Sequence, residues 1–186
     1  MSTLFINACV REHSRTMILA DHLLRRIGGD ITTLDLEKAP VPALNRCTLC
    51  ERDNAKTDDL CAEALRHAVQ FAEADTIVIA APFWDLSFPA LLKDYLENIC
   101  VTGITFTYGD RGPVGLCRGK KLYYVTTCGG GFVPDFGYGY VEALAKNFFG
   151  IPETCCFAAQ GLDVEGADVE EILRQAMVEI DRAFGK

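Results

Sequence analysis

The chain has 186 residues, of which 49% are hydrophobic and 24% charged, as is typical of one folded domain with a substantial core, here expected to span 1–186. Its formal net charge of −8 at pH 7 argues against nucleic acid or an anionic membrane surface as a partner. The first residues do not resemble a secretory signal, and no apolar run reaches the roughly 18 residues of a membrane span. We therefore expect a cytoplasmic protein.

Apolar patterns predict strands that alternate with helices along the whole chain. The expected strands are Thr3–Ala8, Asp30–Leu36, Thr76–Ala81, Lys121–Thr127 and a weaker one at Thr154–Ala159. Five helices are expected. The first begins at a Ser14 cap, and the others are Asp58–Ala74, Pro89 to about Ile99, about Tyr140 to Phe149, and Val169–Phe184. Glu37–Thr57 is expected to be a loop, and Ile104–Cys117 an irregular segment with a short hairpin. This order predicts an α/β fold with a five-stranded parallel sheet and helices on both faces.

In such a sheet, ligands bind outside the carboxyl ends of the strands, where the strand order reverses. Three loops of unusual composition are expected to meet there: Cys9–Thr16, Pro82–Ser87 and Cys128–Tyr138. The sequence therefore places a candidate site at this edge.

The first of these loops carries groups that suit a phosphate monoester. Arg11 and Arg15 supply guanidinium groups, Ser14 and Thr16 supply hydroxyls, and a helix begins just behind them. The alternative is an ordinary helix cap with solvated arginines. Neither a G-x-G-x-x-G nor a P-loop motif occurs, which disfavours a dinucleotide or a nucleoside triphosphate.

The second and third loops suit a planar ligand. Phe83, Trp84 and Phe88 could wall an aromatic ring, although closing the core is the commoner role of such side chains. The run Gly129–Gly131 lets the backbone approach a ligand closely, and its alternative is a flexible turn.

Nine cysteines, an odd number, give poor evidence for a disulfide framework, so we interpret most of them as reduced core residues. Cys47 and Cys50 form a C-x-x-C, but a single pair is only half of a zinc or iron–sulfur site. Because it lies in the expected loop, we expect no metal and no catalytic thiol there. A regulatory disulfide or an adventitious zinc remains as the alternative.

Taken together, the three loops resemble those of the FMN-dependent NAD(P)H oxidoreductases, the family of NADH-azoreductases and NAD(P)H:quinone reductases. The resemblance extends over nearly the whole chain. The matching segments are Ala81–Lys93 (APFWDLSFPALLK), Gly103–Tyr108 (GITFTY), Gly112–Leu116 (GPVGL), Gly119–Lys121 (GKK), Thr127–Gly130 (TCGG), and Arg11 with Ser14 in the first loop.

Two departures from the family pattern, at Cys9-Val10 and at Asp85, affect these loops. Cys9-Val10 replaces Ser-Pro, which removes one hydroxyl from the first loop. Asp85 stands where the family has asparagine, and an ionised aspartate cannot donate a hydrogen bond. These departures bear on the substrate and on the flavin potential more than on FMN binding.

The resemblance implies a flavodoxin-like homodimer in which NADH or NADPH gives a hydride to the N5 of FMN. A quinone, azo compound or similar aromatic acceptor then takes the place of the nicotinamide and receives the electrons. No protein residue acts as a catalyst, because the cofactor carries the chemistry. Expected FMN contacts are Arg11, Ser14, Arg15, Thr16, Pro82, Phe83, Trp84, Asp85, Leu86, Thr127, Cys128, Gly129 and Gly130. Expected acceptor contacts are Phe106, Tyr108, Phe132 and Tyr138.

Two alternatives belong to other classes. A flavodoxin-type electron carrier would act with a protein partner, but its Thr-x-Thr-Gly-x-Thr sort of phosphate loop is absent. A hydrolase would need a triad or a metal site, and no G-x-S-x-G occurs.

Overall fold

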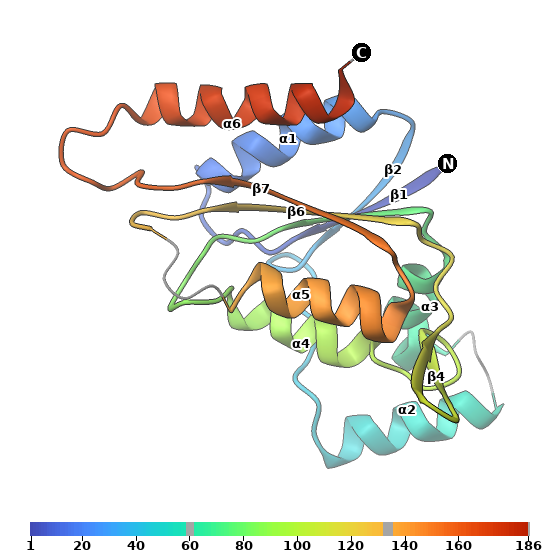
Figure 1. The fold of residues 1–186 in the computed structure, drawn as a ribbon. Helices are drawn as coiled ribbons and strands as arrows, with labels where there is room; N and C mark the ends of the chain where they lie inside the picture. The colour runs from blue at the N-terminus through green and yellow to red at the C-terminus, as the bar shows by residue number, and fades with distance from the viewer. Residues whose placement is uncertain (59–61, 132–135, 186) are drawn as a thin grey trace.

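The computed structural model describes residues 1–58, 62–131 and 136–185 (Figure 1). Five strands form one parallel sheet in the order β2-β1-β3-β6-β7. They are β1 (Ser2–Asn7), β2 (Asp30–Asp35), β3 (Thr76–Ala80), β6 (Lys121–Thr127) and β7 (Glu153–Ala159). All five strands predicted from the sequence are confirmed, each to within one residue at either end.

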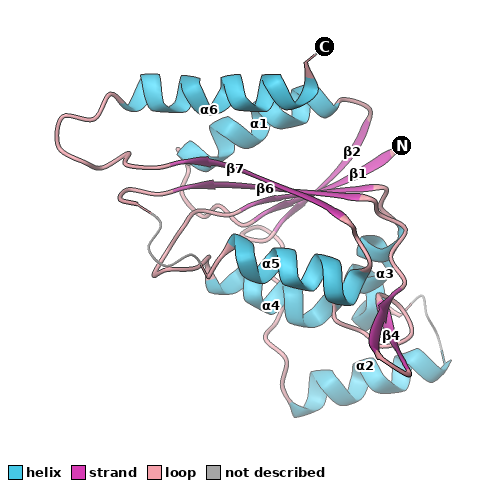
Figure 2. Ribbon diagram, viewed as in Figure 1, coloured by secondary structure: helices cyan, strands magenta, loops and turns pink. Residues whose placement is uncertain are grey.

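Helices cover both faces of the sheet, as Figure 2 shows. On one face lie α1 (Arg15–Ile27) and α6 (Val169–Phe184); on the other lie α3 (Arg66–Glu73), α4 (Ala90–Ile99) and α5 (Tyr138–Leu144). A π-helix, η2 (Ala145–Phe149), continues α5 up to Gly150, which ends it in a left-handed conformation. None of the helices in the described ranges is long and apolar enough to cross a lipid bilayer.

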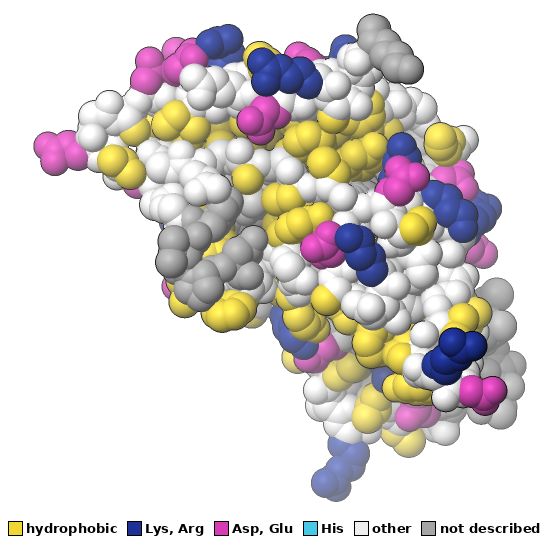
Figure 3. All heavy atoms as spheres, in the orientation of Figure 1, with side chains coloured by type: hydrophobic (Ala, Val, Ile, Leu, Met, Phe, Trp, Pro, Cys, Tyr) yellow, Lys and Arg dark blue, Asp and Glu magenta, His cyan; other side chains and the backbone are white. Residues whose placement is uncertain are grey.

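The core consists of two apolar layers separated by the sheet. Every residue of β3 is buried, as its continuous apolar run predicts for a central parallel strand. Leu19 and Leu23 of α1 pack in the first layer, and Leu92 and Leu96 of α4 in the second. At the sheet edge, β7 leaves several side chains half-exposed, in the region where Figure 3 shows hydrophobic side chains below α6.

One predicted loop is a helix. Glu37–Thr57 was expected to be irregular, but α2 (Arg46–Asp58) occupies its second half and lies outside the other helices of its face (Figure 1). The predicted helix over Asp58–Ala74 is wrong in its first part, because a 3₁₀ turn, η1 (Glu63–Leu65), precedes α3. The sequence of α2 has no apolar stripe, so the periodicity that reveals the other helices is missing.

The predicted hairpin is confirmed as β4 (Phe106–Gly109) paired with β5 (Gly112–Gly115). Its second strand lies directly against the end of η2. A Cβ on Gly115 would lie closer than 3.0 Å to the backbone of Gly150, so the two chain segments meet without room for a side chain.

Gly115→Ala is therefore expected to lower the free energy of unfolding by about 1–3 kcal/mol, because the added methyl must push backbone apart. Gly139→Ala in α5 is the matched control. Its Cβ would meet nothing within 4 Å, so it should stabilise the protein by about 0.5–1 kcal/mol through helix propensity. Urea unfolding of both variants measures the difference. Equal stabilities would mean that the hairpin moves away from η2 without cost.

Candidate functional site

The strand order reverses between β1 and β3, and a cavity of about 310 Å³ opens at the carboxyl ends of these strands. It is lined by Val10, Arg11, His13, Ser14, Arg15, Thr16, Pro82, Phe83, Trp84, Thr127, Cys128, Gly129, Leu162 and Asp163. The three loops expected to meet at this edge thus share one cavity. A fourth segment, the loop after β7, joins them.

Three of the predicted cofactor contacts lie outside this lining. Asp85 lines a neighbouring cavity of about 720 Å³, which shares Trp84 with the first. Leu86 is exposed beside it, and Gly130 lies next to Gly129 at the end of the glycine loop. The remaining ten predicted contacts all belong to the first cavity.

The amino end of α1 forms the polar end of the cavity. Ser14 is the N-cap of this helix, and its hydroxyl accepts a hydrogen bond from the Met17 amide at 3.4 Å. Thr16 is fully buried, and its hydroxyl lies 2.6 Å from that of Thr127, which ties the first loop to the third. A helix start with its amide groups directed at the cavity attracts anions.

The second loop supplies the aromatic wall. Trp84 and Ser87 exchange backbone hydrogen bonds of 3.0 and 2.8 Å, which close a two-residue turn at Asp85 and Leu86. Both turn residues have positive φ, 51° and 69°, a conformation that asparagine and glycine adopt more readily than leucine. The guanidinium carbon of Arg11 lies 5.9 Å from the centre of the Trp84 ring, a cation–π contact across the cavity mouth.

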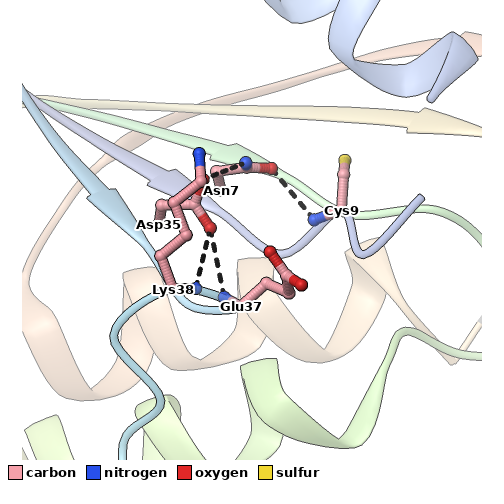
Figure 4. Close-up of polar contacts among 5 residues, drawn as sticks. All are labelled: Asn7, Cys9, Asp35, Glu37 and Lys38. Carbon is pink, nitrogen blue, oxygen red and sulfur yellow. Dashed lines mark hydrogen bonds and ion pairs between the residues drawn. The ribbon is translucent and has the colours of Figure 1, made fainter. Parts of the chain in front are cut away.

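A polar network fixes where the first loop leaves β1 (Figure 4). Asn7 accepts a 2.9 Å hydrogen bond from the Cys9 amide and donates one of 3.3 Å to Asp35 at the end of β2. Asp35 also accepts from the amides of Glu37 and Lys38 and pairs with the Lys38 ammonium at 3.0 Å. Although partial burial acts to raise it, the hydrogen bonds from Lys38 and Glu37 bring the pKa of Asp35 below its usual value.

Cys9, one of the departures from the family pattern, does not line the cavity. Its thiol lies beneath the loop, 3.7 Å from the carbonyl oxygen of Ala80. Burial raises the pKa of this thiol to about 11, against weaker opposing hydrogen bonds from Ser14 and Thr16. Cys9 is therefore a neutral thiol at physiological pH and offers the cavity no anion.

Cys47 and Cys50 lie in the first turns of α2 and not in a loop, which corrects the expectation from sequence. The side chain of Asn45 accepts hydrogen bonds from the amides of Cys47 and Thr48 at 2.8 and 3.2 Å, and thereby caps the helix. Both cysteines are exposed free thiols. Within the described ranges, no three side chains of histidine, cysteine, aspartate or glutamate come together as a metal site.

These environments predict thiol reactivity. At pH 8 Ellman's reagent should modify Cys47 and Cys50 quickly in the native protein, because both are exposed. Burial raises the pKa of Cys9 to about 11 and that of Cys117 to about 12, so their reactive thiolate forms are scarce. Mass mapping after brief labelling measures this order residue by residue, and Cys47→Ser and Cys50→Ser should each remove the early label at their own position. Early labelling of Cys9 would contradict the assigned burial.

The loop after β7 completes the cavity on the side of the glycine loop. Asp163 forms an ion pair with Arg15 at 2.6 Å, and its amide donates to the carbonyl of Gly129 at 2.9 Å. A Cβ on Gly129 would collide with the Asp163 carboxylate, whereas Cβ atoms on Gly130 and Gly131 would meet nothing within 4 Å. Gly129 thus leaves space that the Asp163 side chain occupies, whereas the space beside Gly130 and Gly131 is open.

Three of the four predicted acceptor contacts, Phe106, Tyr108 and Tyr138, line neither cavity. Phe106 is buried against Phe148 with ring centres 5.0 Å apart. Tyr108 is 65% exposed on the hairpin, and the Tyr138 hydroxyl at the start of α5 lies within hydrogen-bond distance of Thr154 and Glu142, at 3.1 and 3.2 Å. Phe132 lies outside the described residues.

Sequence reasoning missed Leu162 and Asp163. The available signal was topological, because β7 runs parallel to β6 and its carboxyl end must reach the same edge of the sheet. Val10 and the exposed His13 also line the cavity and were not among the predicted contacts.

Comparison with known proteins places this geometry in a family context. A family model described as "Flavodoxin-like fold" matches residues 1–184. An FMN-dependent NADH:quinone oxidoreductase 2 of Clostridium acetobutylicum is 40% identical over 182 residues, covering 92% of this chain and 90% of the relative. An FMN-dependent NADH:quinone oxidoreductase of Coprothermobacter proteolyticus is 37% identical over 185 residues, covering 92% and 90%.

Solved structures agree with this result. An azoreductase of Bacillus anthracis superposes with a TM-score of 0.86 at 25% identity, covering 99% of this chain and 98% of the other. An FMN-dependent NADH-azoreductase of the same species, solved in complex with FMN, gives a TM-score of 0.83 at 26% identity, covering 98% and 97%.

Proposed function

Because the chain belongs to the flavodoxin-like family of FMN-dependent NADH:quinone oxidoreductases and azoreductases, we propose that it transfers electrons from NADH to a quinone through bound FMN. Azo compounds are the second class of acceptor that its relatives indicate. The observation that carries the proposal is the cavity at the strand-order reversal, where the amino end of α1, an aromatic wall and a glycine loop meet.

The residues present fit FMN. At one end, Arg11, the capped helix start at Ser14 and the nearby hydroxyls provide the positive potential and the donors that a phosphate needs. Next to this end, Trp84, whose ring centre lies 5.9 Å from the Arg11 guanidinium carbon, offers an aromatic face, and the open space beside Gly130 lets backbone amides reach the polar edge of a ring.

In this assignment the chain binds and orients, and FMN when bound supplies the two-electron chemistry. Arg11 and the α1 amino end hold the phosphate. Pro82–Trp84 and Cys128–Gly130 hold the ring, and the hydrogen bond from the Phe83 amide to the Thr127 carbonyl, 3.0 Å long, keeps these two segments together. No side chain is assigned a proton-transfer step.

We further propose that the acceptor site is completed by a second copy of the chain. Tyr108 is largely exposed and lies far from the cavity of its own chain, as expected for a side chain that serves a partner. Leu86, Phe136 and Tyr140 are exposed apolar residues at or beside the second cavity, where a dimer would cover them. Light scattering should then give about twice the chain mass.

A cytoplasmic location is part of the same proposal. The odd number of cysteines and the exposed free thiols of Cys47 and Cys50 are typical of a reducing compartment. The abundant NADH of the cytosol would be the electron source.

The test begins with the visible spectrum of the purified protein, followed by heat release of the cofactor and chromatography. We expect a yellow protein that yields FMN and oxidises NADH in the presence of menadione or an azo dye. Recovery of FAD, or a colourless protein that does not bind added FMN, would overturn the proposal. Bound FMN without steady-state NADH oxidation would instead indicate an electron carrier.

A further inference from the structure

The loop after β7 is fixed to the glycine loop by a run of backbone hydrogen bonds. Gly161 donates to Gly130 at 2.8 Å, Leu162 to Cys128 at 3.2 Å, and Asp163 to Gly129 at 2.9 Å. These contacts continue the tie between the two chain segments beyond the last paired residues of β6 and β7. The backbone of Asp163 is thus held in place before its side chain makes any contact.

The two carboxylate oxygens of Asp163 have different surroundings. Oδ1 accepts from Nη1 of Arg15 at 2.6 Å, and Oδ2 lies where a Cβ on residue 129 would stand. A Cβ at position 129 would force this carboxylate to shift from its place. Gly129 therefore has a role that its place in a glycine loop does not reveal: it admits Asp163 to the wall of the cavity.

Arg15 is held from the same side by a second acceptor. Its Nη1 also donates to the carbonyl of Leu162 at 3.3 Å. A guanidinium carries five N–H donors, so the two contacts of Nη1 leave those of Nη2 and Nε for a ligand. Fixing a long side chain before the ligand arrives removes part of the conformational entropy that binding would otherwise cost.

We propose that Asp163 is a positioning residue for the cofactor phosphate, acting through Arg15. The inference rests on the proposed function, because it assigns the phosphate of FMN to this end of the cavity. Asp163 is not a ligand itself, since its carboxylate and a phosphate are both anionic and repel each other. Because Asp163 acts through Arg15, and Arg15 contacts the phosphate in this proposal, Asp163 should affect the binding only of cofactors that carry the phosphate.

The experiment titrates cofactor-depleted full-length protein with FMN and, separately, with riboflavin, which lacks the phosphate. Asp163→Ala should weaken FMN binding about tenfold, while riboflavin binding changes less than about twofold. Asp163→Asn should lose less FMN affinity than Asp163→Ala, because the amide oxygen of asparagine still accepts a hydrogen bond from Arg15. In an Arg15→Gln background, Asp163→Ala should have no further effect. Glu165→Gln removes the same charge two residues along the loop and is the matched control.

Each other outcome overturns a defined part of the inference. An equal loss for FMN and riboflavin would assign Asp163 a structural role. Tighter FMN binding in Asp163→Ala would mean that the carboxylate competes with the phosphate for Arg15. Wild-type protein that binds neither flavin would overturn the proposed function itself, whereas the first two results leave that function intact.

Discussion

Arg11→Ala and Ser14→Ala are each expected to weaken FMN binding by about 1–3 kcal/mol, or roughly 5- to 150-fold in dissociation constant. Both residues line the cavity at the amino end of α1. A hydrogen bond to a phosphate is charge-assisted, and its loss leaves the anion under-compensated in a partly enclosed site. Quenching of flavin fluorescence during titration measures the effect.

Each variant needs its own control, because Ser14 also stabilises α1 and Arg11 contributes both charge and shape. Ser14 caps α1, and losing a cap costs about 1 kcal/mol of stability on its own. Asp168→Ala removes the equivalent cap of α6, whose side chain accepts from the Glu171 amide at 3.0 Å, and should leave FMN affinity unchanged. Arg11→Lys keeps the charge but loses the planar fork, so it should bind more tightly than Arg11→Ala. Unchanged affinity in both alanine variants would place the phosphate elsewhere.

The sheet could be predicted from the sequence because its strands carry a strong local signal. The continuous apolar run of β3 indicates a central parallel strand that is covered on both faces. In a parallel sheet the loops after such strands meet at one edge, so their position could be predicted as well. Those loops brought together most of the cofactor contacts that the sequence suggested.

The parts that escaped prediction are those with no hydrophobic pattern. The sequence of α2 has no apolar stripe, and its best local signal is the pair Asn45 and Thr48. The Asn45 amide donates to the Thr48 hydroxyl at 2.9 Å, while the Asn45 side chain caps the helix. Asp163 sits in an irregular loop where only the three-dimensional pairing of β6 and β7 brings it to the cavity. Composition alone cannot distinguish such a carboxylate from a solvated one.

The departure at Asp85 acquires a structural meaning. Asp85 and Leu86 both lie in the left-handed region, in a turn whose backbone asparagine tolerates more readily than most residues. Asp85 is exposed and lines the second cavity beside Trp84, which also walls the first. Its charge is thus near the proposed ring site but in contact with solvent, so its influence on the cofactor is attenuated by water and salt.

Asp85→Asn should raise the flavin midpoint potential by about 15 mV. Two unit charges about 6 Å apart in a water-like medium interact by about 0.7 kcal/mol, and 1.4 kcal/mol corresponds to about 30 mV in a two-electron couple. Removing the carboxylate relieves this repulsion on a ring that becomes negatively charged on reduction, which makes reduction by NADH more favourable. Asp30→Asn, at the amino end of β2 and therefore at the opposite edge of the sheet, removes the same charge and should leave the potential unchanged. Reference dyes measured at one pH and two salt concentrations test both, and the shift should shrink at high salt. An identical or lower potential in Asp85→Asn would mean that this aspartate does not tune the cofactor.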